Sequence, residues 1–158
     1  MKNNSLSISF IFSISLFVPL HALGEGCRFS GEAMQGIDDL YYYIKEDIDE
    51  FNLLCATRLP EQSFSARVSL IDSKLKELEK LKKSVKETLK FGNKIKRQWD
   101  EIRYNCDAYS SDENESRARN NRNTVKDQIR DIKKTYSAIG SCKKILSNKR
   151  KLALKELN

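Results

Sequence analysis

Four cysteines are the side chains of this sequence best suited to covalent or metal chemistry. They are Cys27, Cys55, Cys106 and Cys142, and no two of them lie closer than 28 positions. Zinc ligands usually come in closely spaced pairs, and the only histidine, His21, lies near the N-terminus. An even number of widely spaced cysteines in an exported chain favours two structural disulfides over a metal site.

The first 24 residues have the pattern of a secretory signal peptide. Lys2 precedes an apolar stretch over 8–20, and the small residues of Ala22-Leu23-Gly24 form a cleavage pattern. The apolar stretch is too short for a helix that crosses a bilayer core of ~30 Å. We therefore expect cleavage after Gly24, with Ala22 as the second choice. The mature chain is then a single helical domain over 25–158 without a transmembrane segment, in a periplasmic or secreted location.

Cleavage at that point removes His21, and with it the commonest general base and metal ligand. The sequence also lacks a glycine-rich phosphate loop and a dinucleotide-binding fingerprint. Carboxylates are frequent between residues 38 and 50, where we interpret them as a solvated helix face. They are Asp38, Asp39, Glu46, Asp47, Asp49 and Glu50. We expect no catalytic residue, no cofactor and no metal; a hydrolase of envelope polymers that uses carboxylates alone is the enzymatic alternative.

Residues 97–106, R-Q-W-D-E-I-R-Y-N-C, raise the question of a binding site, since tryptophan and arginine dominate binding hot spots. A seven-residue apolar repeat instead places Trp99 and Cys106 on a buried seam. The candidate contact residues that remain are Arg97, Arg103 and Tyr104 in this stretch, and Tyr42 and Tyr43 in an earlier one.

Helical periodicity dominates the segments that must position these residues. The first repeat has Met34, Tyr41, Ile48 and Cys55 spaced by seven, with Ile37, Ile44 and Phe51 three residues after the first three. This repeat predicts a helix over 31–57. Leu59-Pro60 marks its end, because proline disfavours helical geometry in the residue before it.

A second stripe keeps one heptad phase through the middle of the chain. Its positions are Phe64, Ile71, Leu78, Val85, Gly92, Trp99 and Cys106. It predicts one helix over 63–108, with a bend at Gly92. The alternative is a helix stop at Phe91-Gly92-Asn93, where glycine follows one helix and asparagine caps the next.

A third stripe covers the last part of the chain. Residues 107–123 lose the apolar pattern and gain charge, so we interpret them as a connection that merges into the polar first turns of a helix. The stripe resumes at Val125, Ile129, Ile132, Tyr136, Ile139 and Leu146 and continues more loosely at Leu152 and Leu157. It predicts a helix over most of 117–156, with local distortion at Gly140, since glycine costs a helix ~1 kcal/mol relative to alanine.

Each predicted helix has one apolar stripe, so no helix is stable alone. Burial of all three stripes predicts an all-α fold, an elongated antiparallel bundle of three long helices stapled by two disulfides. In this topology Cys27 pairs with Cys106, and Cys55 pairs with Cys142. If the chain turns at Gly92, the fold is a four-helix bundle in which Cys55 pairs with Cys106 and Cys27 with Cys142.

The formal net charge of +7 restricts the classes of partner. The positive excess lies in 74–97 and 143–155, where Phe91 is the single aromatic residue; aromatic side chains therefore do not interleave with the basic ones for base stacking, which argues against nucleic acid. We expect a protein or an anionic envelope component as the partner. Residues 143–157 also fit a basic amphipathic helix in weak contact with a membrane surface, although the solvated end of the last helix is the simpler interpretation.

A family resemblance rests on six residues, which are Gln98, Trp99, Arg103, Cys106, Cys142 and Arg150. Their spacing resembles the helical lysozyme-inhibitor-like family of small exported bacterial proteins, over about a third of the chain. The resemblance implies an exported compartment and a helical disulfide fold more than it implies inhibition. The sequence departs from the family where Cys27 and Cys55 lie 28 residues apart, since the family has a compact N-terminal cysteine pair.

These observations favour a non-enzymatic exported binding protein that acts on an envelope macromolecule as an inhibitor, immunity factor or assembly accessory. The alternative is a secreted signalling or effector protein that binds a receptor through a helical bundle. Glycosylation at the acceptor pattern Asn114-Glu115-Ser116 would distinguish the alternative, because it requires secretion through an endoplasmic reticulum.

Overall fold

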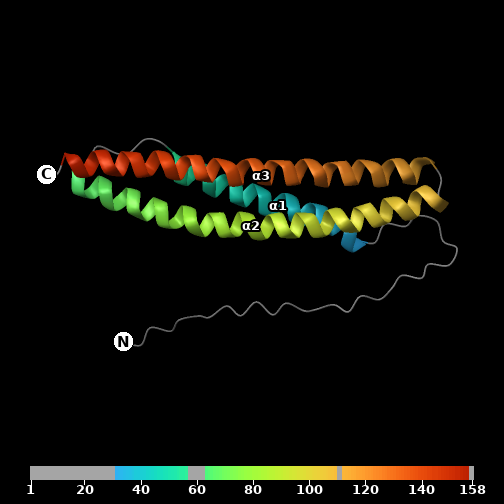
Figure 1. Ribbon diagram of the computed structural model, residues 1–158. Helices are drawn as coiled ribbons and strands as arrows, with labels where there is room; N and C mark the ends of the chain where they lie inside the picture. Colours follow the sequence, from blue (N-terminus) through green and yellow to red (C-terminus); the bar gives the residue numbers. More distant parts are fainter. Residues whose placement is uncertain (1–30, 57–62, 110–111, 157–158) are drawn as a thin grey trace, which may run out of the picture.

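The computed structural model describes residues 31–56, 63–109 and 112–156. These residues form three α-helices and no strand: α1 (Gly31–Cys55), α2 (Phe64–Tyr109) and α3 (Asp112–Lys155). Figure 1 shows the three helices side by side in one long rod. None of them combines the length and the apolar composition that a membrane span requires. The predicted all-α bundle of three helices is confirmed.

Gly92 is a packing position and not a helix stop. It is buried in α2, and a β-carbon there would lie 3.1 Å from Ile129 Cγ1 and 3.3 Å from Leu40 Cδ1. The missing side chain leaves room for Leu40 of α1 and Ile129 of α3 against the α2 backbone. Since α2 continues through Gly92 to Tyr109, the four-helix alternative is wrong.

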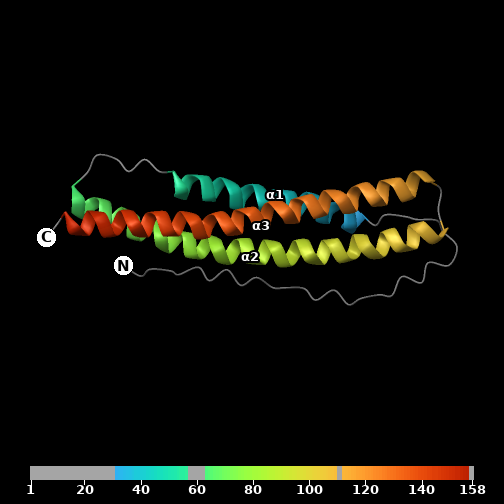
Figure 2. The same cartoon turned by 45° about the horizontal axis from the view of Figure 1, so that its top comes forward.

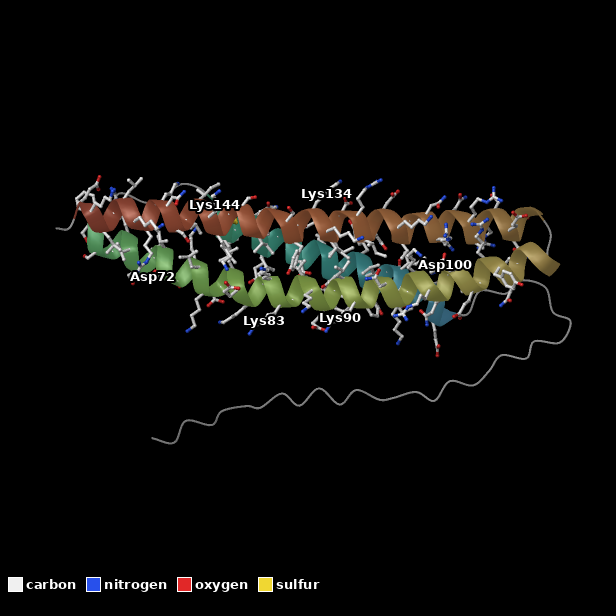
Figure 3. The ribbon with its side chains drawn as sticks, viewed as in Figure 1. Asp72, Lys83, Lys90, Asp100, Lys134 and Lys144 are labelled. Carbon is white, nitrogen blue, oxygen red and sulfur yellow. A yellow bond between two sulfur atoms is a disulfide. The ribbon has the colours of Figure 1, made fainter. Side chains whose placement is uncertain are left out.

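Ion pairs between α2 and α3 set the antiparallel register of these two helices. The pairs are Asp72 with Arg150, Glu79 with Lys143, and Asp100 with Arg122. In each pair the two residue numbers add up to 222, so the register is constant over about 42 Å of helix. Asp72 and Asp100 mark the two ends of this row in Figure 3.

The shortest helix, α1, runs parallel to α3 and covers only part of the α2–α3 pair, as Figures 1 and 2 show. Cys55 is bonded to Cys142, and Asn121 Nδ2 donates to Met34 Sδ at 3.4 Å. Both pairs are 87 residues apart, so the parallel register holds along the whole of α1. With 25 residues against 46 and 44, α1 leaves both ends of its neighbours extending beyond it.

The core is a continuous apolar seam along the rod. In α2 the predicted repeat is buried from Ile71 to Cys106, and the Trp99 side chain is completely enclosed. In α3 the predicted stripe is buried at Val125, Ile129, Ile132, Ile139 and Leu146. Three predicted stripe positions, Phe64, Tyr136 and Leu152, are exposed instead, and Leu157 lies outside the described residues.

The predicted seam of α1 is partly wrong. Ile37 and Ile44 are buried as predicted, but Met34 and Tyr41 are exposed. The buried positions lie one residue earlier, at Ala33, Leu40 and Asp47, with Leu54 partly buried in the same repeat. Because this repeat contains the Asp47 carboxylate, the sequence does not identify it as a buried seam. Asp47 is buried beside hydroxyl groups of α2 that bind its carboxylate.

The connection within 107–123 is shorter than expected, because α2 extends to Tyr109 and α3 begins at Asp112. Most of this segment forms the polar first turns of α3, as the sequence also suggested. Charged side chains of this segment pair along the helix surface, as Arg119 Nη2 does with Glu115 Oε1 at 2.5 Å. Asn114 is therefore a half-buried helical residue. α3 also continues through Gly140 without interruption.

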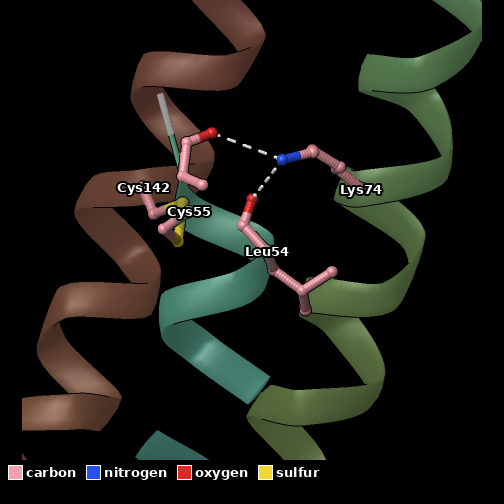
Figure 4. The surroundings of a disulfide bond; sticks show 5 residues. Leu54, Cys55, Lys74 and Cys142 are labelled. Atoms are coloured by element: carbon pink, nitrogen blue, oxygen red, sulfur yellow. Dashed lines mark hydrogen bonds between the residues drawn. A yellow bond between two sulfur atoms is a disulfide. The ribbon is translucent and has the colours of Figure 1, made fainter. Parts of the chain in front are cut away.

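Cys55 at the end of α1 forms a disulfide with Cys142 of α3, the bridge that the three-helix topology predicts (Figure 4). Beside it, Lys74 Nζ of α2 donates to the carbonyl oxygens of Leu54 (3.0 Å) and Ala56 (3.3 Å). α1 has no basic residue in its own last turn, so Lys74 supplies the positive charge that its C-terminal carbonyls favour.

The second predicted bridge joins Cys106, which is buried in α2, to Cys27. Cys27 lies outside the described residues, as does the predicted signal peptide. The Cys27–Cys106 pairing and the cleavage after Gly24 therefore stay predictions.

Candidate binding surfaces

A polar layer interrupts the core where α1 crosses α2. Asp47 is buried, and its carboxylate accepts hydrogen bonds from Ser84 Oγ (2.8 Å, to Oδ1) and Thr88 Oγ1 (2.7 Å, to Oδ2). Ser84 and Thr88 are four residues apart on α2, so their side chains lie on the same side of that helix. The two hydroxyls thus hold one carboxylate of α1 within an otherwise apolar interface.

Burial raises the pKa of the Asp47 carboxyl group, because it disfavours the charged form. The hydrogen bonds from Thr88 and Ser84 act in the opposite direction, and the nearby Glu46 carboxylate adds to the increase. Since both carboxylate oxygens already accept internal hydrogen bonds, this arrangement is suited to holding α1 and α2 in register.

A hollow of about 470 Å³ lies beside this layer. Its lining is mainly acidic and hydroxylic, and consists of Tyr43, Glu46, Asp47, Asp49, Glu50, Ser84 and Thr88. Within residues 31–56, 63–109 and 112–156, no group of His, Cys, Asp or Glu side chains is arranged to hold a metal ion.

Formal charge is unevenly divided among the helices. α1 has seven carboxylates and one lysine, which gives it a formal charge of −6. α2 has 12 basic and seven acidic residues (+5), and α3 has 13 basic and five acidic residues (+8). Among the described side chains, every ion pair lies within α2, within α3 or between these two helices. None of these pairs involves a carboxylate of α1. α1 therefore presents uncompensated negative charge on a basic bundle.

Large apolar side chains are also concentrated on the solvent side of α1. Five are exposed, which we call the α1 face: Met34, Tyr41, Tyr42, Tyr43 and Leu53. Tyr42 is 59% exposed and Leu53 is 73% exposed. The Tyr43 ring packs edge-to-face against Phe91 of α2, with a centroid distance of 5.6 Å. The Glu46 carboxylate, one turn farther along the helix, raises the pKa of the Tyr42 phenol because it favours the protonated form.

The predicted contact residues divide between two places. Tyr42 and Tyr43 belong to the α1 face, whereas Arg97, Arg103 and Tyr104 lie farther along α2. Tyr104 is 77% exposed, Arg97 is exposed and Arg103 is half-buried. Tyr104 follows Phe91, the α2 neighbour of Tyr43, by 13 residues, or about 20 Å along the helix axis. Tyr104 therefore lies apart from the α1 face.

The interpretation of the carboxylates between residues 38 and 50 as a solvated helix face is wrong for Asp47, which is buried. A signal of this burial is nevertheless present, because Ala33, Leu40, Asp47 and Leu54 repeat every seven residues beside the repeat of Ile37 and Ile44. A polar residue in such a repeat calls for donors on a facing helix, and Ser84 and Thr88 have the required one-turn spacing.

The chain matches no protein-family model, no curated protein and no solved structure. The resemblance to the helical lysozyme-inhibitor-like family therefore stays a prediction that rests on the six residues that carry it.

Proposed function

We propose that this protein is an exported, non-enzymatic helical binding protein that acts on another envelope macromolecule as an inhibitor, immunity factor or assembly accessory. The α1 face carries the proposal: five large apolar side chains are exposed on a helix whose other side is already buried against α2 and α3. Aromatic residues and methionine are enriched in protein interfaces, where a few such side chains supply most of the binding free energy.

The charge around the α1 face favours a partner protein with a basic surface. Asp38, Glu46, Asp49 and Glu50 are exposed and form no ion pair with any described residue. Lysines or arginines of a partner would pair with these carboxylates, and they would also make cation–π contacts with the tyrosine rings. This complementarity is compatible with the overall net charge of +7, because the positive charge lies on α2 and α3.

Capture of a partner from an envelope extract by the oxidised protein tests the proposal. A variant with Tyr41→Ser, Tyr42→Ser and Leu53→Ser should lose the captured protein and keep the wild-type melting temperature, because all three side chains are exposed. The matched control is Ile145→Ser with Leu152→Ser, which removes exposed apolar side chains from α3 and should retain the partner.

Undiminished capture by the α1 variant would contradict the proposal. The carboxylate-only hydrolase would replace it if the purified protein released soluble fragments from peptidoglycan and Glu50→Gln abolished the release.

A further inference from the structure

The C-terminal half of α3 has charge of one sign only. Between Asp131 and Glu156 the sequence contains eight lysines and arginines and no carboxylate. Lys143 and Arg150 are used within the bundle, because they pair with Glu79 and Asp72 of α2. The remaining charge includes lysines that no carboxylate of the bundle neutralises.

Three of these lysines lie on one exposed side of the helix. Lys144 and Lys151 are seven residues apart, and Lys155 follows four residues later, which places them on the same side of an α-helix. All three are exposed and form no ion pair with another described residue. Lys144 is labelled on α3 in Figure 3.

Two exposed aliphatic side chains border the lysines. Ile145 is 50% exposed and Leu152 is 61% exposed, and each directly follows one of the lysines in the sequence. The core positions of this part of α3 are Leu146 and Ala153, which are buried, whereas Ile145 and Leu152 lie outside the core. Ile145 borders a hollow that Phe51 and Cys55 of α1 also line. α1 ends beside Cys142, and α3 continues for 13 residues beyond it.

We propose that this C-terminal strip, formed by Lys144, Ile145, Lys151, Leu152 and Lys155, binds the surface of a membrane that contains anionic lipid. In this arrangement α3 lies along the membrane plane and stays within its bundle. The lysines contact lipid phosphates, and the two aliphatic side chains enter the boundary between headgroups and acyl chains. A soluble polyanion would use the lysines alone, so the adjacent aliphatic pair favours lipid.

The strip lies on a different helix from the α1 face, so this inference goes beyond the proposed function. The two are also tested by separate measurements, since partner capture depends on α1 and membrane binding on α3.

Cosedimentation of the full oxidised protein with lipid vesicles tests the inference. Binding is expected to vesicles of phosphatidylcholine with phosphatidylglycerol, but not to phosphatidylcholine alone, and should fall at high salt. A variant with Lys144→Gln, Lys151→Gln and Lys155→Gln should bind about 100-fold more weakly. Ile145→Ser with Leu152→Ser should also weaken binding, although the net charge is unchanged.

The matched control removes the same charge from α2, with Lys76→Gln, Lys83→Gln and Lys94→Gln at exposed positions. It should weaken binding far less than the α3 lysine variant. Equal losses in the two lysine variants would overturn the inference, because they would show diffuse electrostatic attraction. Full binding by the Ile145 and Leu152 variant would overturn it in favour of a polyanion site. A dimer that dissociates in that variant, with no vesicle binding, would assign the strip to a second copy of the chain.

Discussion

Thr88 of α2 donates a 2.7 Å hydrogen bond to the buried carboxylate of Asp47 on α1. Ser84, one turn earlier, donates to the other carboxylate oxygen. A buried polar group between helices fixes their register, because a slip along the axis would leave it without donors. We infer that this layer, together with the Cys55–Cys142 disulfide, defines the axial position of the shortest helix.

Thr88→Val keeps the side-chain volume and removes one donor to Asp47. We expect a loss of about 1–3 kcal/mol in the free energy of unfolding at neutral pH, because one oxygen of a buried carboxylate is left unpaired. The folded-state pKa of Asp47 is already raised, which means that the folded protein binds this proton more tightly than the unfolded chain does. The protonated carboxyl group therefore contributes stability below its unfolded-state pKa, and this contribution is lost as the pH rises through the folded-state pKa. Losing a donor raises that pKa further, so the penalty should shrink as the pH falls and Asp47 becomes neutral.

Urea unfolding over a range of pH measures this effect. Thr135→Val is the matched control, because Thr135 is also buried but its hydroxyl donates to the Asp131 carbonyl of its own helix at 3.1 Å. A penalty for Thr88→Val that is as independent of pH as the penalty for Thr135→Val would contradict the account.

Removing the Cys55–Cys142 disulfide with alanine at both positions should lower the free energy of unfolding by about 4–5 kcal/mol. The two cysteines are 87 residues apart, and the bridge therefore restricts a long loop of the unfolded chain. Thermal and urea unfolding measure the loss. Peptide mapping without reduction should recover Cys55 linked to Cys142, whereas a peptide linking Cys55 to Cys106 would refute the three-helix topology.

The two glycines in the long helices should respond in opposite ways to the same substitution. Gly92→Val places a branched side chain against Ile129 and Leu40, and this overpacking should cost about 1–3 kcal/mol. Gly140→Val should cost nothing or stabilise slightly, since no side chain or neighbouring helix of the described structure lies within 4 Å of its β-carbon position and glycine is the poorer helix former. Circular dichroism melting curves compare the two, and equal effects would mean that Gly92 is not a packing position.

Trp99→Ala should lower the free energy of unfolding by about 3–5 kcal/mol, because Trp99 is fully enclosed and its truncation leaves a cavity. Tyr104→Ala, five residues later on α2, is the matched aromatic truncation at an exposed position and should change stability by less than about 0.5 kcal/mol. If Trp99→Ala kept the wild-type melting temperature and lost a binding partner, the tryptophan would belong to a surface and not to the core.

Much of the bundle could be predicted from periodicity. An apolar residue at every seventh position from Ile71 to Cys106 allows only one buried side for α2, and the structure buries that side. The Cys55–Cys142 bridge follows from the helix lengths. Because α2 is continuous and α3 runs antiparallel to it, the middle of α3 lies beside the C-terminal end of α1. The exposure of Tyr104 follows from the same phase, whereas the phase expected for α1 wrongly placed Tyr41 on the buried seam.

The structural roles of Gly92 and Asp47 depend on tertiary packing and could not be predicted from the sequence. A glycine followed by asparagine is locally the same signal for a helix stop and for a close approach, and only the positions of Leu40 and Ile129 distinguish them. Asp47 could be buried only because two hydroxyls, 37 and 41 residues away in the sequence, lie opposite it. Periodicity defines which side of one helix is apolar, whereas the depth of each position depends on the side chains that the neighbouring helices place against it.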